Sequence, residues 1–450
     1  MPARLRVLYV TQVPPSPPRY GAQVRIHGLM TALAERHEVS AVCCAASQAE
    51  AERARAAMRA YCRHVDIVVD PTSDVTVQKR LLQLRSLASR HSFERLLFTT
   101  TRMQRRIDAA LSARRYDVVN VEGPFVVHHR FRTAPAGAPP PRIVLDEHNV
   151  EYDVNRQIAG RQDASAARRL YAAVNWRKMR REEEGAWGRV DALTVTSPHD
   201  AGRVRAVHPR ARVAVVPNAV DVGRYAPRPD DPPPERNTLL FFGALDYFPN
   251  SDALAFFLDQ VWPRVLATHP AVRLRILGRR PPAWLAARRA PGVEIGGFVE
   301  DLRPAIAAAG AVIVPLRLGG GTRLKILEAM AMARPIVSTA LGAEGIDVAH
   351  GRELLLADGA EGFAAGIGRL LDDPALGARL GRAARALVER RYSWRASAAV
   401  LDALLQERTG TAADRAAAAI ASPGPARRLA PPASPGPGTG DVAPTPDGTR

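Results

Sequence analysis

The sequence has no long apolar run. No uninterrupted stretch of 18 or more apolar residues occurs among its 450 residues, and a helix needs about 20 such residues to cross a bilayer. The opening segment, MPARLRVLYVTQVPPSPP, is apolar over too short a span and then meets prolines, so we expect no secretory signal. These features predict a cytoplasmic protein without membrane spans.

Cysteine is also scarce. The three cysteines, Cys43, Cys44 and Cys62, do not show the spacing of metal ligands. Two of them are adjacent in a predicted strand, where successive side chains alternate between faces. We therefore expect buried, reduced thiols in a reducing cytosol.

Two motifs are missing as well. No Asp-x-Asp motif occurs, which would hold a divalent metal on a diphosphate, so we expect no metal or other cofactor. No G-x-G-x-x-G follows the first predicted strand, which argues against an NAD-dependent Rossmann enzyme.

Acidic residues are outnumbered. The formal net charge is +18, and residues 1–210 carry 34 Lys and Arg against 21 Asp and Glu. A basic N-terminal half attracts phosphates of nucleic acid, anionic lipid or a phosphorylated substrate. A solvated basic surface without a partner is the alternative that charge alone leaves open.

Apolar strands alternate with helical segments along most of the chain, which predicts an α/β fold with parallel sheets. The predicted strands are 4–10, 38–45, 65–70, 116–123, 141–148 and 190–197, and then 212–221, 238–245, 272–280, 293–300, 311–318, 335–339 and 353–358. The pattern restarts in the second half, and APRPDDPPPERN (226–237) has the composition of a linker. We therefore predict two doubly wound domains in tandem, 1–210 and 211–375, which bind ligand in a cleft between them. Helices over 376–408 and a disordered Ala/Pro/Gly-rich tail over 409–450 follow.

The segment IVPLRLGGGTRLKILEAMAMARPIVST (313–339) predicts a strand, a glycine loop and a helix. Gly319, Gly320 and Gly321 let backbone N–H groups approach an anion at the positive end of the helix. We expect Thr322 to cap this helix, and Arg323 and Lys325 to add positive charge. Glu328 lies one turn beyond Lys325 and could accept hydrogen bonds from ribose hydroxyls. A Lys325–Glu328 surface pair is the alternative.

Several stretches in order resemble the retaining glycosyltransferases of family 4, which have the GT-B fold of two Rossmann-like domains with a cleft between them. The resemblance covers about residues 4–400. It rests on YVTQVPPSPPRYGAQVRIHGLMTALAERHEV, VVPNAVD, LLFFGALDYFPNSDAL, LGRRPP, IGGFVEDLRPAIAAAGAVIVPL and the glycine-loop segment. It implies that 1–210 is the acceptor side, that 211–375 binds the nucleotide-sugar donor, and that the helices of 376–408 pack back on the N-terminal domain.

The resemblance implies roles for individual residues. Glu328 matches the glutamate that contacts ribose, whereas Gly320 stands where many members have a second glutamate. GALDYFPN, beginning at Gly243, replaces a segment that usually carries Arg and Lys. This leaves Arg279, Arg317, Arg323 and Lys325 as candidates for neutralising the diphosphate, with Lys325 preferred.

Further contacts follow from the same resemblance. Gly21 and Arg25 are expected to meet the donor phosphate, and the main chain of Gly297, Phe298 and Val299 to read the nucleobase. His148 is expected near the transferred sugar or the acceptor. Its neighbours Asp146, Glu147 and Glu151 could raise its pKa. The acceptor-side candidates are Glu122, Asn149 and Glu151.

The function expected from this resemblance is retaining, metal-independent sugar transfer in the synthesis of cell-surface polysaccharide or glycoconjugate. A UDP-, GDP- or ADP-sugar would be the donor, and a glycan or lipid-linked molecule the acceptor. The basic segment RRLYAAVNWRKMRR (168–181) is compatible with peripheral contact with the inner face of the membrane, but a solvated helix that packs on the sheet is the more usual explanation. The alternatives are a non-hydrolysing nucleotide-sugar epimerase and a basic nucleic-acid-binding protein, and we expect no nucleic-acid partner.

Overall fold

The computed structural model describes residues 3–19, 21–70, 76–131, 134–160 and 165–407. The predicted disordered tail, 409–450, lies outside these residues. Within them, no helix is long and apolar enough to cross a membrane.

The N-terminal half builds a seven-stranded parallel sheet with the order β3-β2-β1-β4-β5-β6-β7. Its strands are rich in Val, Leu and Ile and are largely buried, as expected for a parallel sheet covered on both faces. The strands are β1 (Arg6–Thr11), β2 (Glu38–Ala45), β3 (His64–Val69), β4 (Val118–Glu122), β5 (Arg142–Glu147), β6 (Ala192–Val195) and β7 (Val213–Val215). This sheet and the helices that pack on it form the first lobe.

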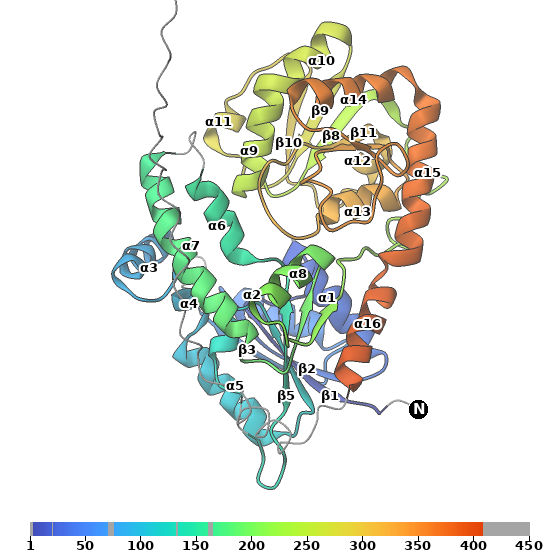
Figure 1. Ribbon diagram of the computed structural model, residues 1–450. Coiled ribbons are helices and arrows are strands. Elements are labelled where there is room, and N and C mark those ends of the chain that lie inside the picture. The colour runs from blue at the N-terminus through green and yellow to red at the C-terminus, as the bar shows by residue number, and fades with distance from the viewer. Residues whose placement is uncertain (1–2, 20, 71–75, 132–133, 161–164, 408–450) are drawn as a thin grey trace, which may run out of the picture. The chain divides into compact units, whose positions relative to one another are not determined.

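The C-terminal half builds a six-stranded parallel sheet with the order β10-β9-β8-β11-β12-β13. Its strands are β8 (Glu235–Phe242), β9 (Arg273–Leu277), β10 (Val293–Gly297), β11 (Ala309–Val314), β12 (Ile336–Ser338) and β13 (Leu355–Leu356). This sheet and its helices form the second lobe. Together the two sheets confirm the predicted α/β fold with two Rossmann-like doubly wound domains (Figure 1).

Helices connect the strands in both lobes. In the first lobe they are α1 (Gly21–Ala34), α2 (Gln48–Met58), α3 (Thr76–Ala88), α4 (Phe93–Phe98), α5 (Thr101–Ala113), α6 (Glu151–Ala159), α7 (Ala166–Trp187) and α8 (Pro198–Val207). In the second they are α9 (Phe248–Phe256), α10 (Trp262–Thr268), α11 (Ala283–Ala286), α12 (Arg303–Ala308), α13 (Leu324–Ala331), α14 (Ala360–Asp372) and α15 (Pro374–Arg391), and α16 (Trp394–Gln406) follows. A short π-helix, Phe257–Val261, joins α9 to α10, so this helical stretch contains an irregular turn.

The last two helices pack on different lobes. Ala384 and Val388 of α15 belong to the core of the second lobe, whereas Leu401 of α16 belongs to the core of the first. A Cβ on Gly28 would lie only 2.2 Å from Cδ2 of the Trp394 indole, so the glycine lets α16 approach α1 closely (Figure 1). The chain therefore returns to the first lobe after completing the second.

The boundary between the sheets lies later than the predicted residue 211. Strand β7 pairs with β6 through Leu193 and Val213, so the segment expected to open the second domain completes the first sheet. The predicted linker also ends early, because Glu235 already belongs to β8. The hydrophobic pattern could not assign this strand, because an edge strand has the same composition in either sheet.

Candidate active site

Strands β4 and β5 end side by side and bring three titratable side chains together. Glu122 is the last residue of β4, and Asp146 pairs with it from β5. His148 follows β5 directly, and its Nε2 donates to Glu122 Oε2 at 2.7 Å and lies 3.6 Å from Asp146 Oδ2. Parallel strands place their carboxyl ends at one sheet edge, which explains this juxtaposition.

Arg25 reaches this cluster from α1. Its guanidinium is buried and donates to both oxygens of Asp146, at 2.9 and 2.7 Å, and to the carbonyl of Val216 at 3.0 Å. Asp146 also accepts from the Thr194 hydroxyl at 2.5 Å. The predicted contact between Arg25 and a donor phosphate therefore needs correction, because this side chain is 1% exposed and its charge is paired inside the first lobe.

The environment moves the pKa values of this cluster apart. Burial would raise the pKa of Asp146, but the neighbouring Arg25 guanidinium lowers it below its ordinary value. Burial, reinforced by the charge of Asp146, raises the pKa of Glu122 to about 7. Burial opposes protonation of His148, but the hydrogen bond to Glu122 and the charge of Asp146 raise its pKa above the ordinary value. Of the neighbours expected to raise this pKa, Asp146 does so, whereas the largest upward contribution comes from Glu122, which was not among them.

The same three residues have the composition of a metal site. One ligand atom from each of Glu122, Asp146 and His148 lies within 4.8 Å of the others. However, both oxygens of Asp146 already accept from Arg25, whose fixed charge occupies the role that a cation would have. This donor set therefore fits a closed network of hydrogen bonds better than a metal ion.

The other acceptor-side candidates lie beside His148. Asn149 donates to Glu151 Oε1 at 2.9 Å, and Glu151 begins α6. Burial raises the pKa of Glu151 to about 7. The carboxylate of Glu183 accepts from the N–H groups of Glu151 and Tyr152 at 2.8 and 3.0 Å and so holds the start of α6.

The glycine loop of the second lobe meets this region directly. A Cβ on Gly321 would lie 2.9 Å from the carbonyl oxygen of His148 and 3.0 Å from Asn149 Cβ, and its φ of 71° also favours glycine. A Cβ on Gly320 would lie 3.7 Å from Asn149 Cβ. Gly319 donates its N–H to Gln157 Oε1 of α6 at 3.0 Å. The glycines therefore allow close contact between the lobes, a role that was not predicted from the sequence.

The helix after this loop has its N-cap one residue later than predicted. Arg323 occupies the N-cap position without a side-chain bond, so the prediction that Thr322 caps the helix is wrong. The Thr322 hydroxyl and Arg323 Nη2 are buried and have no hydrogen-bond partner among the described residues. Arg323 Nη1 donates to the carbonyls of Gly320 and Gly321. Two orphaned donors beside a helix N-terminus suit a bound anion.

Lys325 and Glu328 have separate partners. Lys325 Nζ donates to Asn250 Oδ1 at 2.9 Å and lies 4.3 Å from the centre of the Phe241 ring. Burial lowers the pKa of Lys325 to about 7. Glu328 accepts from the Tyr225 hydroxyl at 3.0 Å, and burial raises its pKa. This arrangement contradicts the alternative of an exposed pair at the surface.

The remaining donor-side candidates lie at the carboxyl ends of the strands of the second lobe. Gly243 follows β8, and a Cβ there would lie 3.1 Å from Lys325 Nζ. Arg279 follows β9, and its carbonyl accepts from Leu245 N. Gly297 ends β10, followed by Phe298, which is 65% exposed, and Val299, which packs on the core. Arg317 is committed to Asp252, to which it donates at 2.8 and 3.1 Å, and is a weaker phosphate candidate.

The two lobes also share contacts that were not predicted from the sequence. Asn218 accepts from Arg25 Nη1 at 3.0 Å and donates to the Thr322 carbonyl at 3.1 Å, so it links the His148 cluster to the glycine loop. A Cβ on Gly21, at the start of α1, would lie 3.6 Å from Leu324 Cδ1, at the start of α13. Two helix N-termini from different lobes therefore face the same place. Asn218 and Asn250 lie inside two motifs of the family resemblance, VVPNAVD and LLFFGALDYFPNSDAL, whereas no motif pointed to Gln157.

Known protein families match both halves of the chain. Residues 20–224 match the model described as glycosyltransferase family 4, and residues 236–373 match the model described as glycosyl transferases group 1. The two matches follow one another and together take in most of the chain. Both models describe glycosyltransferases, and the two-sheet architecture is the GT-B fold. These matches favour neither the epimerase nor the nucleic-acid-binding alternative.

Individual relatives agree with this family. A Mycobacterium tuberculosis glycogen synthase is 31% identical over 198 residues, which cover 41% of this chain and 46% of the relative. A Corynebacterium glutamicum GDP-mannose-dependent monoacylated alpha-(1-6)-phosphatidylinositol monomannoside mannosyltransferase is 29% identical over 251 residues, 48% and 62% of the two chains. The alignment to the first of these spans about half of the relative's length. The structure of sucrose-phosphate synthase from Thermosynechococcus elongatus superposes with a TM-score of 0.64 at 18% identity, covering 92% of this chain and 100% of that one, and supports the GT-B fold.

Proposed function

We propose that this glycosyltransferase is a retaining, metal-independent enzyme that transfers a sugar from a nucleotide-diphosphate sugar to a glycan or lipid-linked acceptor. One observation carries the proposal. The glycine loop that precedes Lys325 and Glu328 in the second lobe lies directly against the turn that holds His148 in the first. A donor diphosphate at this loop would place its sugar beside His148.

The donor half of the site has groups for each part of a nucleotide diphosphate. The orphaned donors of Thr322 and Arg323, the cation of Lys325 and the N-terminus of α13 would receive the diphosphate. Glu328, turned toward Tyr225, would accept from ribose hydroxyls. The exposed turn at Phe298 would meet the nucleobase. The GDP-mannose-dependent relative supports a nucleotide-sugar donor, and the base remains open among UDP, GDP and ADP.

The reaction would take place on one face of the sugar. The bond from the anomeric carbon to the phosphate oxygen breaks, the bond to the acceptor oxygen forms, and the acceptor proton passes to the departing phosphate. The protein places the reactants and stabilises the developing negative charge. Arg323 and Lys325 would supply that charge stabilisation in place of a metal. His148, held by Glu122, would bind and orient the sugar or acceptor.

A lipid-linked or growing glycan acceptor would place the enzyme in cell-surface polysaccharide or glycoconjugate synthesis, in the cytoplasm and at times on the inner face of the membrane. The lipid acceptor named for the mannosyltransferase relative supports this choice.

Calorimetry with UDP, GDP and ADP tests the donor site. We expect one nucleotide to bind the wild type, and Lys325→Ala and Glu328→Ala each to weaken that binding by roughly tenfold or more, because each removes a charged partner. His148→Ala should bind the nucleotide normally and transfer sugar poorly. Arg228→Ala, at an exposed position, is the control. Unchanged affinity in both donor-site variants would refute the assignment, and loss of transfer on adding EDTA would refute metal independence.

A further inference from the structure

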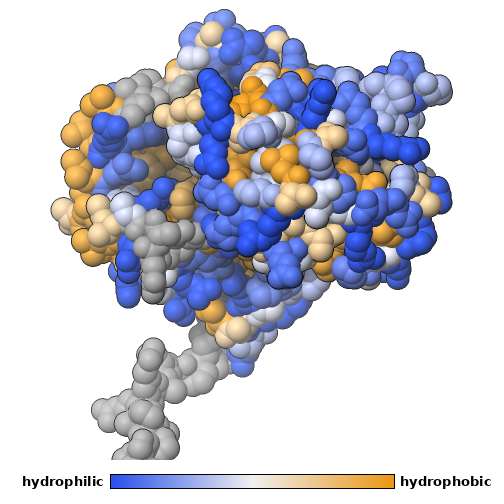
Figure 2. Space-filling view, turned by 90° about the horizontal axis from the view of Figure 1, so that it is seen from above, coloured by the Kyte–Doolittle hydropathy of each residue, from blue (hydrophilic) through white to orange (hydrophobic). Residues whose placement is uncertain are grey.

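Exposed apolar side chains concentrate on helix α3. Among the described residues, ten large hydrophobic side chains are strongly exposed, and four of them belong to α3: Val77 (66%), Leu81 (61%), Leu84 (64%) and Leu87 (46%). A fifth, Leu170 (68%), belongs to α7, which packs beside α3. In the space-filling view, hydrophobic atoms gather at the left edge, the side on which Figure 1 draws α3 (Figure 2). Such clustering marks an interaction surface.

These side chains share one face of the helix. Val77, Leu81 and Leu84 are spaced four and three residues apart, so they form a stripe along α3. The buried Ser86 lies on the opposite side, since consecutive helical residues are rotated by about 100°. Arg80 and Arg85 flank the stripe, one on each side. The stripe therefore points away from the protein and has cations along both edges.

The two helical segments that carry the stripe and Leu170 hold positive charges only. Residues 76–91 contain four Lys and Arg and no Asp or Glu, and residues 165–181 contain six Lys and Arg and again no Asp or Glu. Lys79, Arg80 and Arg85 form no ion pair among the described residues. A surface of this kind complements an anionic one.

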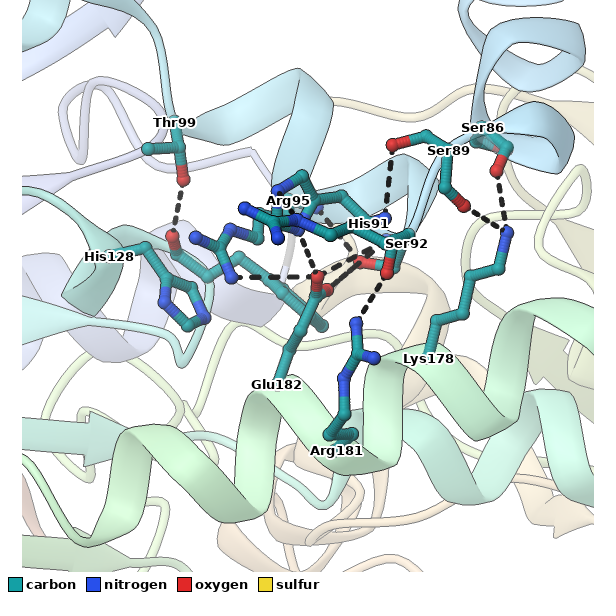
Figure 3. A network of polar contacts seen from close by, with 12 residues as sticks. Ser86, Ser89, His91, Ser92, Arg95, Thr99, His128, Lys178, Arg181 and Glu182 are labelled. Carbon is teal, nitrogen blue, oxygen red and sulfur yellow. Dashed lines mark hydrogen bonds and ion pairs between the residues drawn. The ribbon is translucent and has the colours of Figure 1, made fainter.

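Contacts with α7 hold α3 in this position. Lys178 Nζ donates to the carbonyls of Ser86 and Ser89, at 2.7 Å each, and Arg181 donates to the Arg90 carbonyl (Figure 3). Glu182 accepts from the Ser92 hydroxyl at 2.5 Å and from His91 Nδ1 at 2.9 Å. Two basic residues of the segment 168–181 thus bind the end of α3. The segment that suggested membrane contact in the sequence therefore supports α3, whose own face is open.

We propose that α3, together with Leu170, docks on an anionic lipid membrane, with the leucines among the acyl chains and Arg80 and Arg85 at the headgroups. A second copy of the chain fits less well, because a two-fold pairing of this face would bring the same cations together. The proposal names the surface for the membrane contact included in the proposed function. It does not depend on the donor chemistry.

Vesicle sedimentation tests the proposal with the full chain. The wild type should bind vesicles of phosphatidylcholine mixed with phosphatidylglycerol and should bind pure phosphatidylcholine weakly. Leu81→Glu/Leu84→Glu and Arg80→Glu/Arg85→Glu should each reduce binding to the mixed vesicles by roughly tenfold or more. The controls are Val400→Glu, at another exposed apolar position, and Arg379→Glu/Arg382→Glu, which changes the same charge on α15. Both controls should bind clearly better than the α3 variants.

Three results would overturn this assignment. The first is equal binding by the wild type to both kinds of vesicle, and the second is equal losses in the α3 variants and the controls. The third is a wild-type dimer in gel filtration that becomes monomeric in Leu81→Glu/Leu84→Glu, which would identify a second copy as the partner. Calorimetry with the nucleotide should give wild-type affinity in the α3 variants, so failure here is distinguishable from failure of the donor site.

Discussion

Glu122 and Asp146 are neighbouring carboxylates that the protein holds in opposite ways. Arg25 keeps the pKa of Asp146 low, whereas burial raises that of Glu122 to about 7. The sequence allowed His148 and its acidic neighbours to be predicted, because these residues follow recognisable strands. It did not reveal that Arg25, 121 positions from Asp146, would neutralise it, since that pairing exists only after folding.

The raised pKa of Glu122 predicts a pH-dependent stability. The folded protein retains protons on Glu122 and His148 that the unfolded chain releases at lower pH. Their contribution is therefore present below the ordinary values of about 4.3 and 6.5 and is lost as the pH rises through the raised ones. Glu122→Gln removes the Glu122 carboxyl and, with it, the main interaction that raises the pKa of His148. We expect the free energy of unfolding to fall less in this variant than in the wild type between about pH 5 and 8.

Denaturant unfolding at several pH values measures this difference. Glu361→Gln changes an exposed carboxyl in the same way and should leave the wild-type slope intact. A slope in Glu122→Gln as steep as that of the wild type would show that proton retention by Glu122 and His148 does not cause the pH dependence.

Elements were easier to predict than their ends. The strand–glycine loop–helix order over 313–339 was predicted, but Thr322 is not the cap, because the loop bends toward His148 and the helix begins only at Leu324. The use of glycine for contact between lobes could not be predicted from local pattern, because the surface it meets comes from another part of the chain. At Gly321, the positive φ and the closeness of the His148 carbonyl both favour glycine.

Gly321→Ala separates these two effects. The variant would combine a φ of 71° with a Cβ at 2.9 Å from the His148 carbonyl. Gly137→Ala has a similar φ, 78°, with no heavy atom within 4 Å, and serves as the matched control. We expect about 1–2 kcal/mol of destabilisation in the control from backbone strain, and more in Gly321→Ala, with a loss of sugar transfer confined to the latter. Equal unfolding free energies and equal activity would mean that the loop can move away from His148.

At the scale of the whole molecule, the strand pattern predicted two sheets and their class, because buried parallel strands have a distinctive composition. The pattern could not predict how the lobes meet, which depends on a few polar contacts between residues far apart in sequence. Asn218 makes one such contact with each lobe, to Arg25 in the first and to the Thr322 carbonyl in the second. It is 8% exposed, so its two hydrogen bonds are largely shielded from water.

Replacing Asn218 with Ala should therefore affect both lobes. Arg25 would lose one acceptor and the Thr322 carbonyl one donor, which predicts a loss of about 2–3 kcal/mol in the free energy of unfolding. The glycine loop would also be held less firmly, so nucleotide affinity should fall along with stability. Asn237→Ala, at an exposed position on β8, is the control and should change neither quantity. If Asn218→Ala loses stability but binds nucleotide as the wild type does, the asparagine stabilises the fold without positioning the donor loop, and Thr322 must be held by the second lobe alone.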